Sequence, residues 1–518
     1  MSNLKSRILR NVLSNWATYG VDIVVAFFLF PILVRSLGDS DYGIWTLIAS
    51  LTGYLGLLDF GVRGAVTRYV ARFHAETAHE RSGQVASTAL AMFLAAGALA
   101  IATCVLLALL VDTIFQIPPG QRTTAQYLVI LGGANVAASL ASGVFGGIVV
   151  GLQRFDLLSG LGVGITALRA LAIVLALKMG YGLLTLASIQ LAFSVAGGLA
   201  NVWLSFRLYP ELRRGFGRPD WKHARLIFSF SLYSFLLHVG ARLIYYTDTL
   251  VVGMFLPVSF ITYYAIGGSL IEYVRGLLSG VSTTIAPAAS ALEAQRQMQQ
   301  LQQLFLQSIQ MVMVVALPIG VAFLTCGGTF IGLWMGPQYV ETSGQVLIVL
   351  TLTMLLSAAN HPTVSIALGL GRHKPLVFVL LVEGLANFAL KLALVQTMGI
   401  VGVAWGTAIP AIVRNLVFLP WYARRVLDIS PSTFVLTSWI RPTVGILPYA
   451  FVTYLVNHYW PASSLSVFFL QIALALPVAF LPLWYVSFST EQRASHWEFA
   501  MSRLPMPQTR GTRPDPMK

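Results

Sequence analysis

The chain is a succession of long apolar runs separated by short polar segments. A helix of about 20 apolar residues is long enough to cross a hydrocarbon core about 30 Å thick. Runs of this kind lie at 14–35, 41–62, 84–111, 123–150, 156–177, 181–206, 226–255, 260–286, 303–326, 343–368, 375–398, 401–423, 433–456 and 464–487. The pattern therefore predicts about fourteen membrane-spanning helices that cover almost the whole chain.

Composition supports this interpretation and removes several others. Hydrophobic residues make up 57% of the 518 positions and charged residues only 10%, which is outside the range of soluble proteins. The net charge of +14 would suggest nucleic acid in a soluble protein, but the chain has no DNA- or RNA-binding motif. We therefore expect no nucleic-acid partner. The two cysteines lie in apolar runs, so the sequence predicts neither a disulfide framework nor a metal site.

The basic residues are distributed unequally between the two sides of the predicted membrane. With the N-terminus placed in the cytoplasm, most of the 33 Lys and Arg residues fall in loops on that side, whereas the opposite loops carry Arg35, Arg122 and Lys178. This asymmetry follows the positive-inside rule and predicts a multi-pass protein with both termini cytoplasmic. The opposite loops are short and leave no room for a catalytic domain, so we expect a transporter and not an enzyme.

A basic segment at 207–225 divides the predicted spans into six before it and six after it, with two more at the C-terminal end. Because six is even, both halves enter the membrane in the same orientation, as in parallel repeats around a central cavity. We predict an all-α integral membrane fold with two pseudo-symmetric six-helix lobes, at 1–210 and 211–427. Two further helices follow at 428–490, and 491–518 forms a cytoplasmic tail.

Ionised residues inside the spans are the candidates for function. Each costs about 2.5 to 3.5 kcal/mol to insert into hydrocarbon, so each needs a partner or a water-filled cavity. The substrate-binding candidates are Arg242, Arg275, Glu272, Asp248, Lys391 and Glu383, with Arg63 and Arg68 at the basic inner rim. The ion-coupling candidates are Asp22, Asn15 and His238.

Several of these residues admit two interpretations. Asn15 and Asp22 lie on one polar stripe of the first span, which is either a proton, cation or sugar-hydroxyl site or an interhelical hydrogen bond. Arg242 and Glu272 fall near the same depth and could pair across a helical hairpin. If Arg242 is free instead, its planar guanidinium can bind two phosphate oxygens. Arg275 could pair with Glu272 within one helix.

The spacing of Glu383, Asn387 and Lys391 places all three on one face of the eleventh span. That face either lines a cavity or forms a solvated or self-paired seam. Arg169 and Arg414 lie closer to the membrane surfaces, where snorkelling of the side chain is an alternative to a functional role.

Several motifs resemble a known family. In the first half these are Leu37-Gly38-x-x-x-Tyr42-Gly43-x-Trp45, Tyr54-Leu55-Gly56-Leu57-Leu58-Asp59-Phe60-Gly61 and Arg68-Tyr69-Val70-Ala71. In the second half they are Gly369-x-Gly371-Arg372-x-Lys374, Glu383-Gly384-x-x-Asn387 and the run from Gly399 to Pro410. Both sets are similar to the signatures of bacterial polysaccharide biosynthesis flippases of the Wzx type.

The resemblance implies the fold of the multidrug/oligosaccharidyl-lipid/polysaccharide exporter superfamily, with a cavity between two lobes and alternating access. It implies an undecaprenyl-pyrophosphate-linked oligosaccharide as substrate, moved to the outer leaflet of the bacterial inner membrane for O-antigen, capsule or exopolysaccharide export. It also implies membrane lipids, a polysaccharide polymerase and chain-length machinery as partners. No cofactor is implied, and coupling to H⁺ or Na⁺ is left open.

Two other functions stay open at this point. A drug or cation antiporter of the same superfamily would need an acidic, aromatic cavity, whereas here bases match acids within the spans. A membrane glycan polymerase or ligase would need a placed base and an acceptor site on the outer face, which the short outer loops disfavour.

Overall fold

The computed structural model describes residues 2–282 and 285–494, with side chains described for all of these except 2–17, 226, 228–234 and 281. All regular secondary structure in these ranges is helical. The α-helices are α1 (Ser2–Leu37), α2 (Asp39–Leu55), α3 (Val62–Ala75), α4 (His79–Ile114), α5 (Arg122–Gly151), α6 (Phe155–Lys178), α7 (Leu183–Leu208), α8 (Trp221–Tyr245), α9 (Thr247–Phe255), α10 (Ser259–Ser282), α11 (Ile285–Ala294), α12 (Met298–Trp334), α13 (Val340–Ser357), α14 (Asn360–Gly369), α15 (Lys374–Val413), α16 (Leu419–Leu427), α17 (Pro431–Val435), α18 (Arg441–Tyr459) and α19 (Leu465–Ser487).

The helices coincide with the predicted spans. Within the described part of the chain, 10 helical stretches are long and apolar enough to cross a membrane. The described residues of the other predicted spans also lie mostly in helices. One stretch, Lys374–Leu427, contains two predicted spans because α15 turns back at Gly399, whose φ is 60° and ψ −140°. The backbone after this turn packs on the backbone before it, with Gly406 against Lys391. The prediction of an all-α membrane protein is confirmed, and a count of about fourteen spans is compatible with it.

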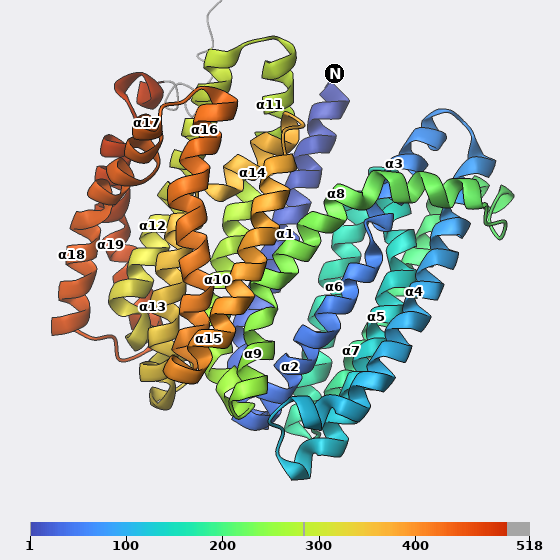
Figure 1. The fold of residues 1–518 in the computed structure, drawn as a ribbon, viewed down its shortest axis with the longest axis horizontal. Coiled ribbons are helices and arrows are strands. Elements are labelled where there is room, and N and C mark those ends of the chain that lie inside the picture. Colours follow the sequence, from blue (N-terminus) through green and yellow to red (C-terminus); the bar gives the residue numbers. More distant parts are fainter. Residues whose placement is uncertain (1, 283–284, 495–518) are drawn as a thin grey trace, which may run out of the picture.

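The helices pack in two groups (Figure 1). In the first group α5 packs against α4, α7 and α3, and α1 packs against α6. In the second group α12 and α15 both pack against α13, α8 packs against α15, and α18 packs against α12 and α19. Figure 1 shows α1, α2 and α8 where the two groups meet. The lobe boundaries at 210 and 427 stay a prediction.

The two groups are joined at one end of the molecule, which we call the closed end and which comprises residues 35–43, 258–262 and 334–339. There the Tyr339 hydroxyl donates a hydrogen bond of 2.6 Å to Asp39 Oδ1, and Arg35 Nη2 donates one of 3.1 Å to the carbonyl of Trp334. Gly43 lies directly against the carbonyl of Val258, and a side chain at position 43 would collide with it. Side-chain hydrogen bonds and close backbone contact therefore seal this end.

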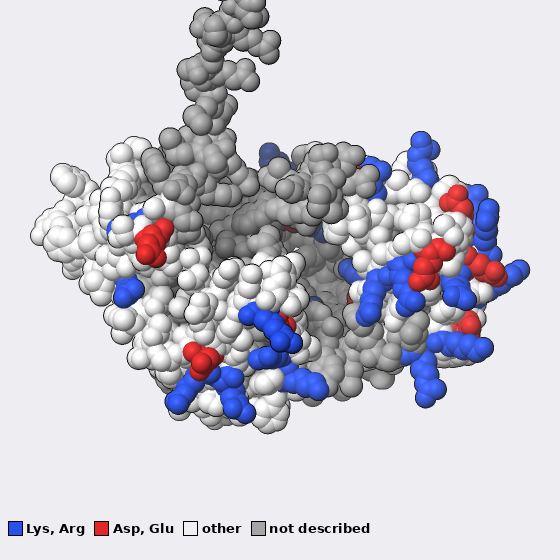
Figure 2. Space-filling model, turned by 90° about the horizontal axis from the view of Figure 1, so that it is seen from above, with Lys and Arg blue, Asp and Glu red and all other residues white. Residues whose placement is uncertain are grey.

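The opposite end, which we call the basic end, includes residues 63–81, 207–225, 372–374 and 424–425. Figure 2 looks onto it and shows Lys and Arg gathered over both groups of helices. These segments are the loops that the positive-inside rule assigns to the cytoplasm.

Candidate functional site

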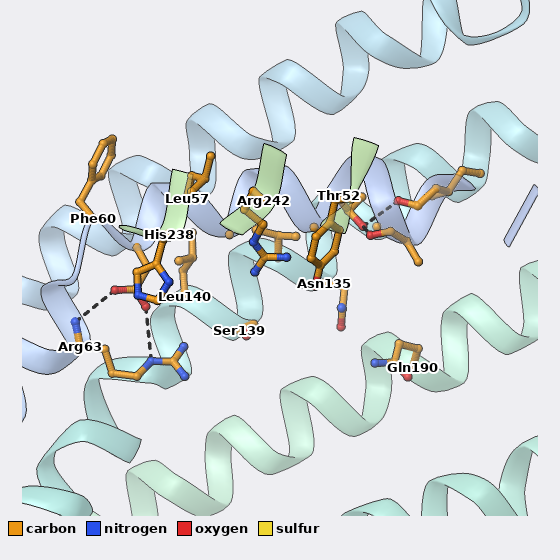
Figure 3. Close-up of a pocket in the computed structure, with 18 of the residues that line it drawn as sticks. Thr52, Leu57, Phe60, Arg63, Asn135, Ser139, Leu140, Gln190, His238 and Arg242 are labelled. Atoms are coloured by element: carbon orange, nitrogen blue, oxygen red, sulfur yellow. Dashed lines mark hydrogen bonds and ion pairs between the residues drawn. The ribbon is translucent and has the colours of Figure 1, made fainter. Parts of the chain in front are cut away.

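A cavity of about 820 Å³ lies between α2, α3, α5, α7 and α8 and the short helix η1 (Gly56–Asp59) (Figure 3). It is lined by three of the predicted site residues, Arg63, His238 and Arg242. Among the described residues that line it, Asp59 alone carries a negative charge. Two guanidinium groups against one carboxylate give this cavity, which we call the basic cavity, a net positive charge.

Arg242 has the clearest arrangement for binding an anion. Its guanidinium carbon lies 4.1 Å from the centre of the Tyr246 ring, and its Nη1 is buried with no hydrogen-bond partner. Among the described side chains, none forms an ion pair with it. A buried guanidinium nitrogen without an acceptor is costly, so this position favours an anionic ligand.

Two glycines on α2 and η1 make the space that the guanidinium occupies. A Cβ atom at Gly53 would lie 3.4 Å from Arg242 Nη1 and 2.5 Å from the Tyr246 ring, and one at Gly56 would lie 3.3 Å from Arg242 Nη2. Larger residues at either position would displace the guanidinium. Gly56 belongs to the segment Tyr54–Gly61 that resembles the flippase signature, and Gly53 directly precedes that segment.

The backbone at Arg242 is held from the neighbouring helix. The amide of Tyr246 donates a hydrogen bond of 3.0 Å to the Arg242 carbonyl at the end of α8, and the Tyr54 hydroxyl of α2 donates a second one of 3.1 Å to the same oxygen. Tyr54 therefore fixes the turn of α8 that carries the guanidinium.

The other two basic residues lie toward the basic end of the cavity. Arg63 Nε is 3.4 Å from Asp59 Oδ2, and the Arg63 side chain is 50% exposed. A Cβ atom at Gly143 would lie 2.7 Å from Arg63 Nη2, so a third glycine leaves room for a guanidinium. His238 is exposed one turn before Arg242 on α8, and both point into the cavity (Figure 3). Arg68 is exposed on α3 but does not line the cavity.

Four other substrate candidates, Asp248, Glu272, Arg275 and Glu383, line a second cavity of about 320 Å³, which is bordered by α1, α2, α8, α9, α10, α13, α14 and α15. Its charged residues are paired. Lys391, which is fully buried, forms an ion pair with Asp248 and also donates a hydrogen bond of 3.1 Å to the carbonyl of Ile244. Arg414 Nη1 is 2.5 Å from Glu383 Oε2, with both side chains almost completely buried.

These pairings decide between several sequence interpretations. Glu383, Asn387 and Lys391 are all buried on one face of α15, as their spacing predicts. The seam is neither solvated nor self-paired, because Lys391 pairs with Asp248 and Glu383 with Arg414, and Glu383 also lines the second cavity. Snorkelling is wrong for Arg414, which is 6% exposed, because its partner Glu383 holds it inside the protein.

The predicted pair between Arg242 and Glu272 is also wrong. Glu272 instead lies 2.6 Å from Arg275 on its own helix, and the Arg275 guanidinium carbon stacks 3.8 Å from the centre of the Tyr245 ring. The intrahelical alternative for Arg275 is therefore the one that the structure adopts.

The ion-coupling candidates are not brought together. Asp22 is exposed on α1, near enough to Arg169 of α6 for electrostatic attraction, and it lines neither cavity. The side chain of Asn15 lies outside the described residues. Of the two candidates whose side chains are described, His238 lines the basic cavity and Asp22 does not.

Sequence reasoning missed the uncharged polar residues of the basic cavity. These are Thr52 on α2, Asn135 and Ser139 on α5, and Gln190 on α7. Asn135 and Ser139 are four residues apart in an apolar run, which places them on one helical face. Polar residues at that spacing in a span are the signal that could have identified them.

Curated relatives match most of the chain. EpsK, a membrane protein of Bacillus subtilis, is 22% identical over 444 residues, covering 82% of this chain and 85% of EpsK. Agl15 of Haloferax volcanii, whose name describes a low-salt glycan biosynthesis flippase, is 24% identical over 74% of this chain and 76% of its own length. A Shigella flexneri protein whose name describes an O-antigen transporter is 20% identical over 82% of this chain and 99% of its own length.

Solved structures share the fold. The lipid II flippase MurJ in an inward closed conformation superposes with a TM-score of 0.71 at 14% identity, over 96% of this chain and 100% of MurJ. An inward-facing multidrug resistance MATE family transporter of the MOP superfamily superposes with a TM-score of 0.64 at 16% identity, over 82% of this chain and 99% of its own. A sequence model described as polysaccharide biosynthesis protein matches residues 8–293, over half of the chain, so this membrane transporter belongs to the polysaccharide biosynthesis protein family.

Proposed function

We propose that this protein is a flippase that moves an undecaprenyl-pyrophosphate-linked oligosaccharide from the cytoplasmic to the outer leaflet of the bacterial inner membrane by alternating access. The product would supply export of O-antigen, capsule or exopolysaccharide, with a polymerase and chain-length machinery acting after it. The observation that carries the proposal is the unpaired Arg242 guanidinium in a cavity of net positive charge.

The chemistry of a diphosphate suits this cavity. A guanidinium donates two parallel hydrogen bonds to phosphate oxygens, and a buried site with few competing waters strengthens them. Arg63 lies nearer the basic end and is half exposed, so it attracts the anion first and Arg242 receives it. Thr52, Ser139, Asn135 and Gln190 add hydrogen-bonding groups of the kind that sugar hydroxyls need.

The two ends of the molecule fit one state of an alternating-access cycle. If the basic end faces the cytoplasm, the sealed closed end separates the cavity from the outside, and cargo enters from the inner leaflet. Switching access then requires the hydrogen bonds from Tyr339 to Asp39 and from Arg35 to Trp334 to break. Both are exchangeable for water, which keeps the cost of opening low.

The membrane potential favours the loaded step. The inside of the membrane is negative, so moving one negative charge to the outside lowers the free energy by about 2.3 kcal/mol per 100 mV. The return of the empty carrier has no such gain. We include binding of H⁺ or Na⁺ near Asp22 in the proposal for that step, with Asn15 and His238 as the other candidates.

Replacement of Arg242 tests the proposal. In a flippase-deficient strain, the Arg242→Ala variant should abolish glycan export while the folded protein stays in the membrane, and Arg242→Lys should restore it only in part. Arg425→Ala, which removes an exposed arginine outside the basic cavity, is the matched control. Full export by Arg242→Ala would remove this residue from the substrate path and with it the main support for the proposal.

The basic cavity disfavours a drug or cation antiporter. A cationic drug would meet Arg63 and Arg242 with Asp59 as counter-charge, and Asp59 is already paired with Arg63. Like-charge repulsion in a partly buried cavity opposes such a ligand.

A further inference from the structure

The outward face of α7 changes from apolar to basic where this helix reaches the basic end. Val195, Leu199 and Trp203 follow one another at one-turn spacing, and their side chains are 44%, 65% and 63% exposed. Arg207 continues the row one turn later and is also exposed. An exposed apolar row on a membrane helix faces the lipid tails, so the change from tryptophan to arginine marks the level of the lipid headgroups.

Two guanidinium groups lie at this level, each over an aromatic ring of α7. Arg207 Cζ is 5.4 Å from the centre of the Trp203 ring, and Arg213 Cζ is 5.8 Å from the centre of the Phe206 ring. Trp203 and Phe206 are three positions apart, which makes them neighbours on the helix surface. The Phe206 ring is itself held against Phe216, with 5.2 Å between the ring centres. Both guanidinium groups are therefore positioned at the end of α7.

The backbone that carries Arg213 is packed on α4. Leu212 beside it is fully buried, and a Cβ atom at Gly83 of α4 would lie 2.5 Å from the Leu212 carbonyl oxygen. Four residues after Arg213, the amide of Gly217 donates a hydrogen bond of 2.7 Å to the Ser87 hydroxyl of α4. These contacts on both sides of Arg213 hold its backbone in place beside the end of α7.

Arg207 and Arg213 have no anionic partner within the described part of the protein. Neither forms an ion pair or a side-chain hydrogen bond there, although Glu211 lies in the same short helix as Arg213, η3 (Pro210–Arg214). Arg72 at the same end differs, since its Nε lies 2.8 Å from Glu76 Oε1. An aromatic ring contacts the face of a guanidinium and leaves the N–H groups at its edge free to donate to an anion.

This surface is reached from the bilayer and not from the basic cavity. The residues of α7 that line the cavity are Ala187 and Gln190, and the helical spacing places them on the face opposite Trp203. Lipids of the surrounding leaflet are the molecules that meet the outward face. A zwitterionic headgroup would bring its own cation close to the two arginines, whereas an anionic headgroup adds only attraction. Charge therefore selects an anionic phospholipid.

We propose that Arg207 and Arg213 bind the phosphate of an anionic phospholipid, such as phosphatidylglycerol or cardiolipin, in the leaflet at the basic end. The two guanidinium groups donate hydrogen bonds to the phosphate oxygens, Trp203 lies at the level of the glycerol backbone, and an acyl chain follows the row of Leu199 and Val195. The site lies outside the basic cavity and does not depend on the proposed flippase function.

Binding of two phospholipids that differ only in the headgroup tests this. The full-length protein, delipidated in detergent, is titrated with phosphatidylglycerol and with phosphatidylcholine of identical acyl chains, and native mass spectrometry resolves the first bound lipid. We expect the first phosphatidylglycerol to bind about tenfold more tightly than phosphatidylcholine, or better, because two basic side chains meet the anionic headgroup.

Variants then locate the preference. The double variant Arg207→Gln with Arg213→Gln should lower the preference to less than about threefold. The matched control is Arg72→Gln with Arg218→Gln, which removes the same charge from the same end, where the guanidinium groups already have carboxylate partners at 2.8 and 3.9 Å. The control should change the preference by less than about twofold. If the double variant aggregates in size-exclusion chromatography, Arg207→Gln alone takes its place.

Three results would overturn the proposal. The first is equal binding of the two phospholipids to the unaltered protein. The second is a preference that the double variant retains, or that the control loses equally, which would remove Arg207 and Arg213 from the site. The third comes from geranylgeranyl diphosphate as an added probe: a loss of its binding in the double variant as large as that of phosphatidylglycerol would make the surface a site for lipid-linked diphosphate. The role proposed for Arg242 is unaffected by each result, because the two sites share no residue.

Discussion

Tyr339 donates a hydrogen bond of 2.6 Å to the carboxylate of Asp39, joining the first residue of α2 to a segment 300 positions later in the chain. The Thr262 hydroxyl donates a second bond, of 2.7 Å, to the backbone carbonyl of the same aspartate. Asp39 is thus the point where three distant segments meet. The closed end depends on this junction and on the backbone contact at Gly43.

Gly43 tests whether close backbone contact seals the closed end. A Cβ atom there would overlap the carbonyl of Val258, so Gly43→Leu should force α2 away from the segment before α10. Spin labels on Gly120→Cys and Gln338→Cys, in a background with both native cysteines replaced, should show a longer distance population by electron resonance. Gly20→Leu is the control, since nothing lies within 4 Å of a Cβ atom at that position. An unchanged distance distribution would mean that the seal does not rely on Gly43.

Gly53 tests the space around Arg242. The Gly53→Ala substitution brings a methyl group within 2.5 Å of the Tyr246 ring, which must move together with the guanidinium stacked on it. We expect glycan export to fall at least about tenfold while the protein remains folded, since a misplaced binding group loses most of its effect. Gly64→Ala alters another glycine of the same cavity where nothing lies within 4 Å, and it should be tolerated. Equal export by the two variants would contradict this account.

The buried pair of Lys391 and Asp248 should contribute to folding and not to cargo binding. Lys391→Met leaves a carboxylate unpaired at a site that is 13% exposed and should cost about 3 to 5 kcal/mol. Adding Asp248→Asn should restore most of that stability, because no unpaired charge remains. Thermal unfolding in detergent, followed by intrinsic fluorescence, compares the variants. If the double variant is no more stable than Lys391→Met, the unpaired charge of Asp248 is not the cause of the lost stability.

The pair of Arg275 and Glu272 should matter much less for stability. The Glu272 side chain is 66% exposed, and solvent-exposed pairs contribute about 1 kcal/mol or less. Arg275 would also keep its stacking on Tyr245 if the carboxylate were lost. Glu272→Gln should therefore lower the melting temperature far less than Lys391→Met in the same assay. A loss as large as that of Lys391→Met would indicate that Glu272 is buried in solution.

The sequence was sufficient to predict the helices but not their partners. Apolar runs locate the spans because hydrocarbon demands them, and the four-residue spacing of Glu383, Asn387 and Lys391 predicts their shared face. The pairing of Lys391 with Asp248 joins helices more than a hundred residues apart, which no local spacing encodes. Boundaries were also less certain: the loop expected at 327–342 begins only after α12 ends at Trp334.

The same distinction applies to the basic cavity. His238 and Arg242 were identifiable because ionisable groups in a span are costly, and Arg63 because it lies at the predicted basic inner rim. Gly53 and Gly56 were not, because a glycine reveals its role only when a group from another helix is seen against it. Asn135 and Gln190 carry no charge, and uncharged polar residues are common in apolar helices. The sequence alone therefore does not distinguish these two from the others. Tertiary packing decides which of these face a cavity.

Helix α2 has one further consequence. Its 17 residues form a rod of about 25 Å, with Asp39 and Gly43 at one extremity and Gly53 and Tyr54 at the other. The first two residues touch the seal, and the last two touch Arg242 and its backbone. One rigid helix therefore contacts both the seal and the arginine of the basic cavity, and in the proposed cycle a displacement of either contact would be transmitted along α2 to the other.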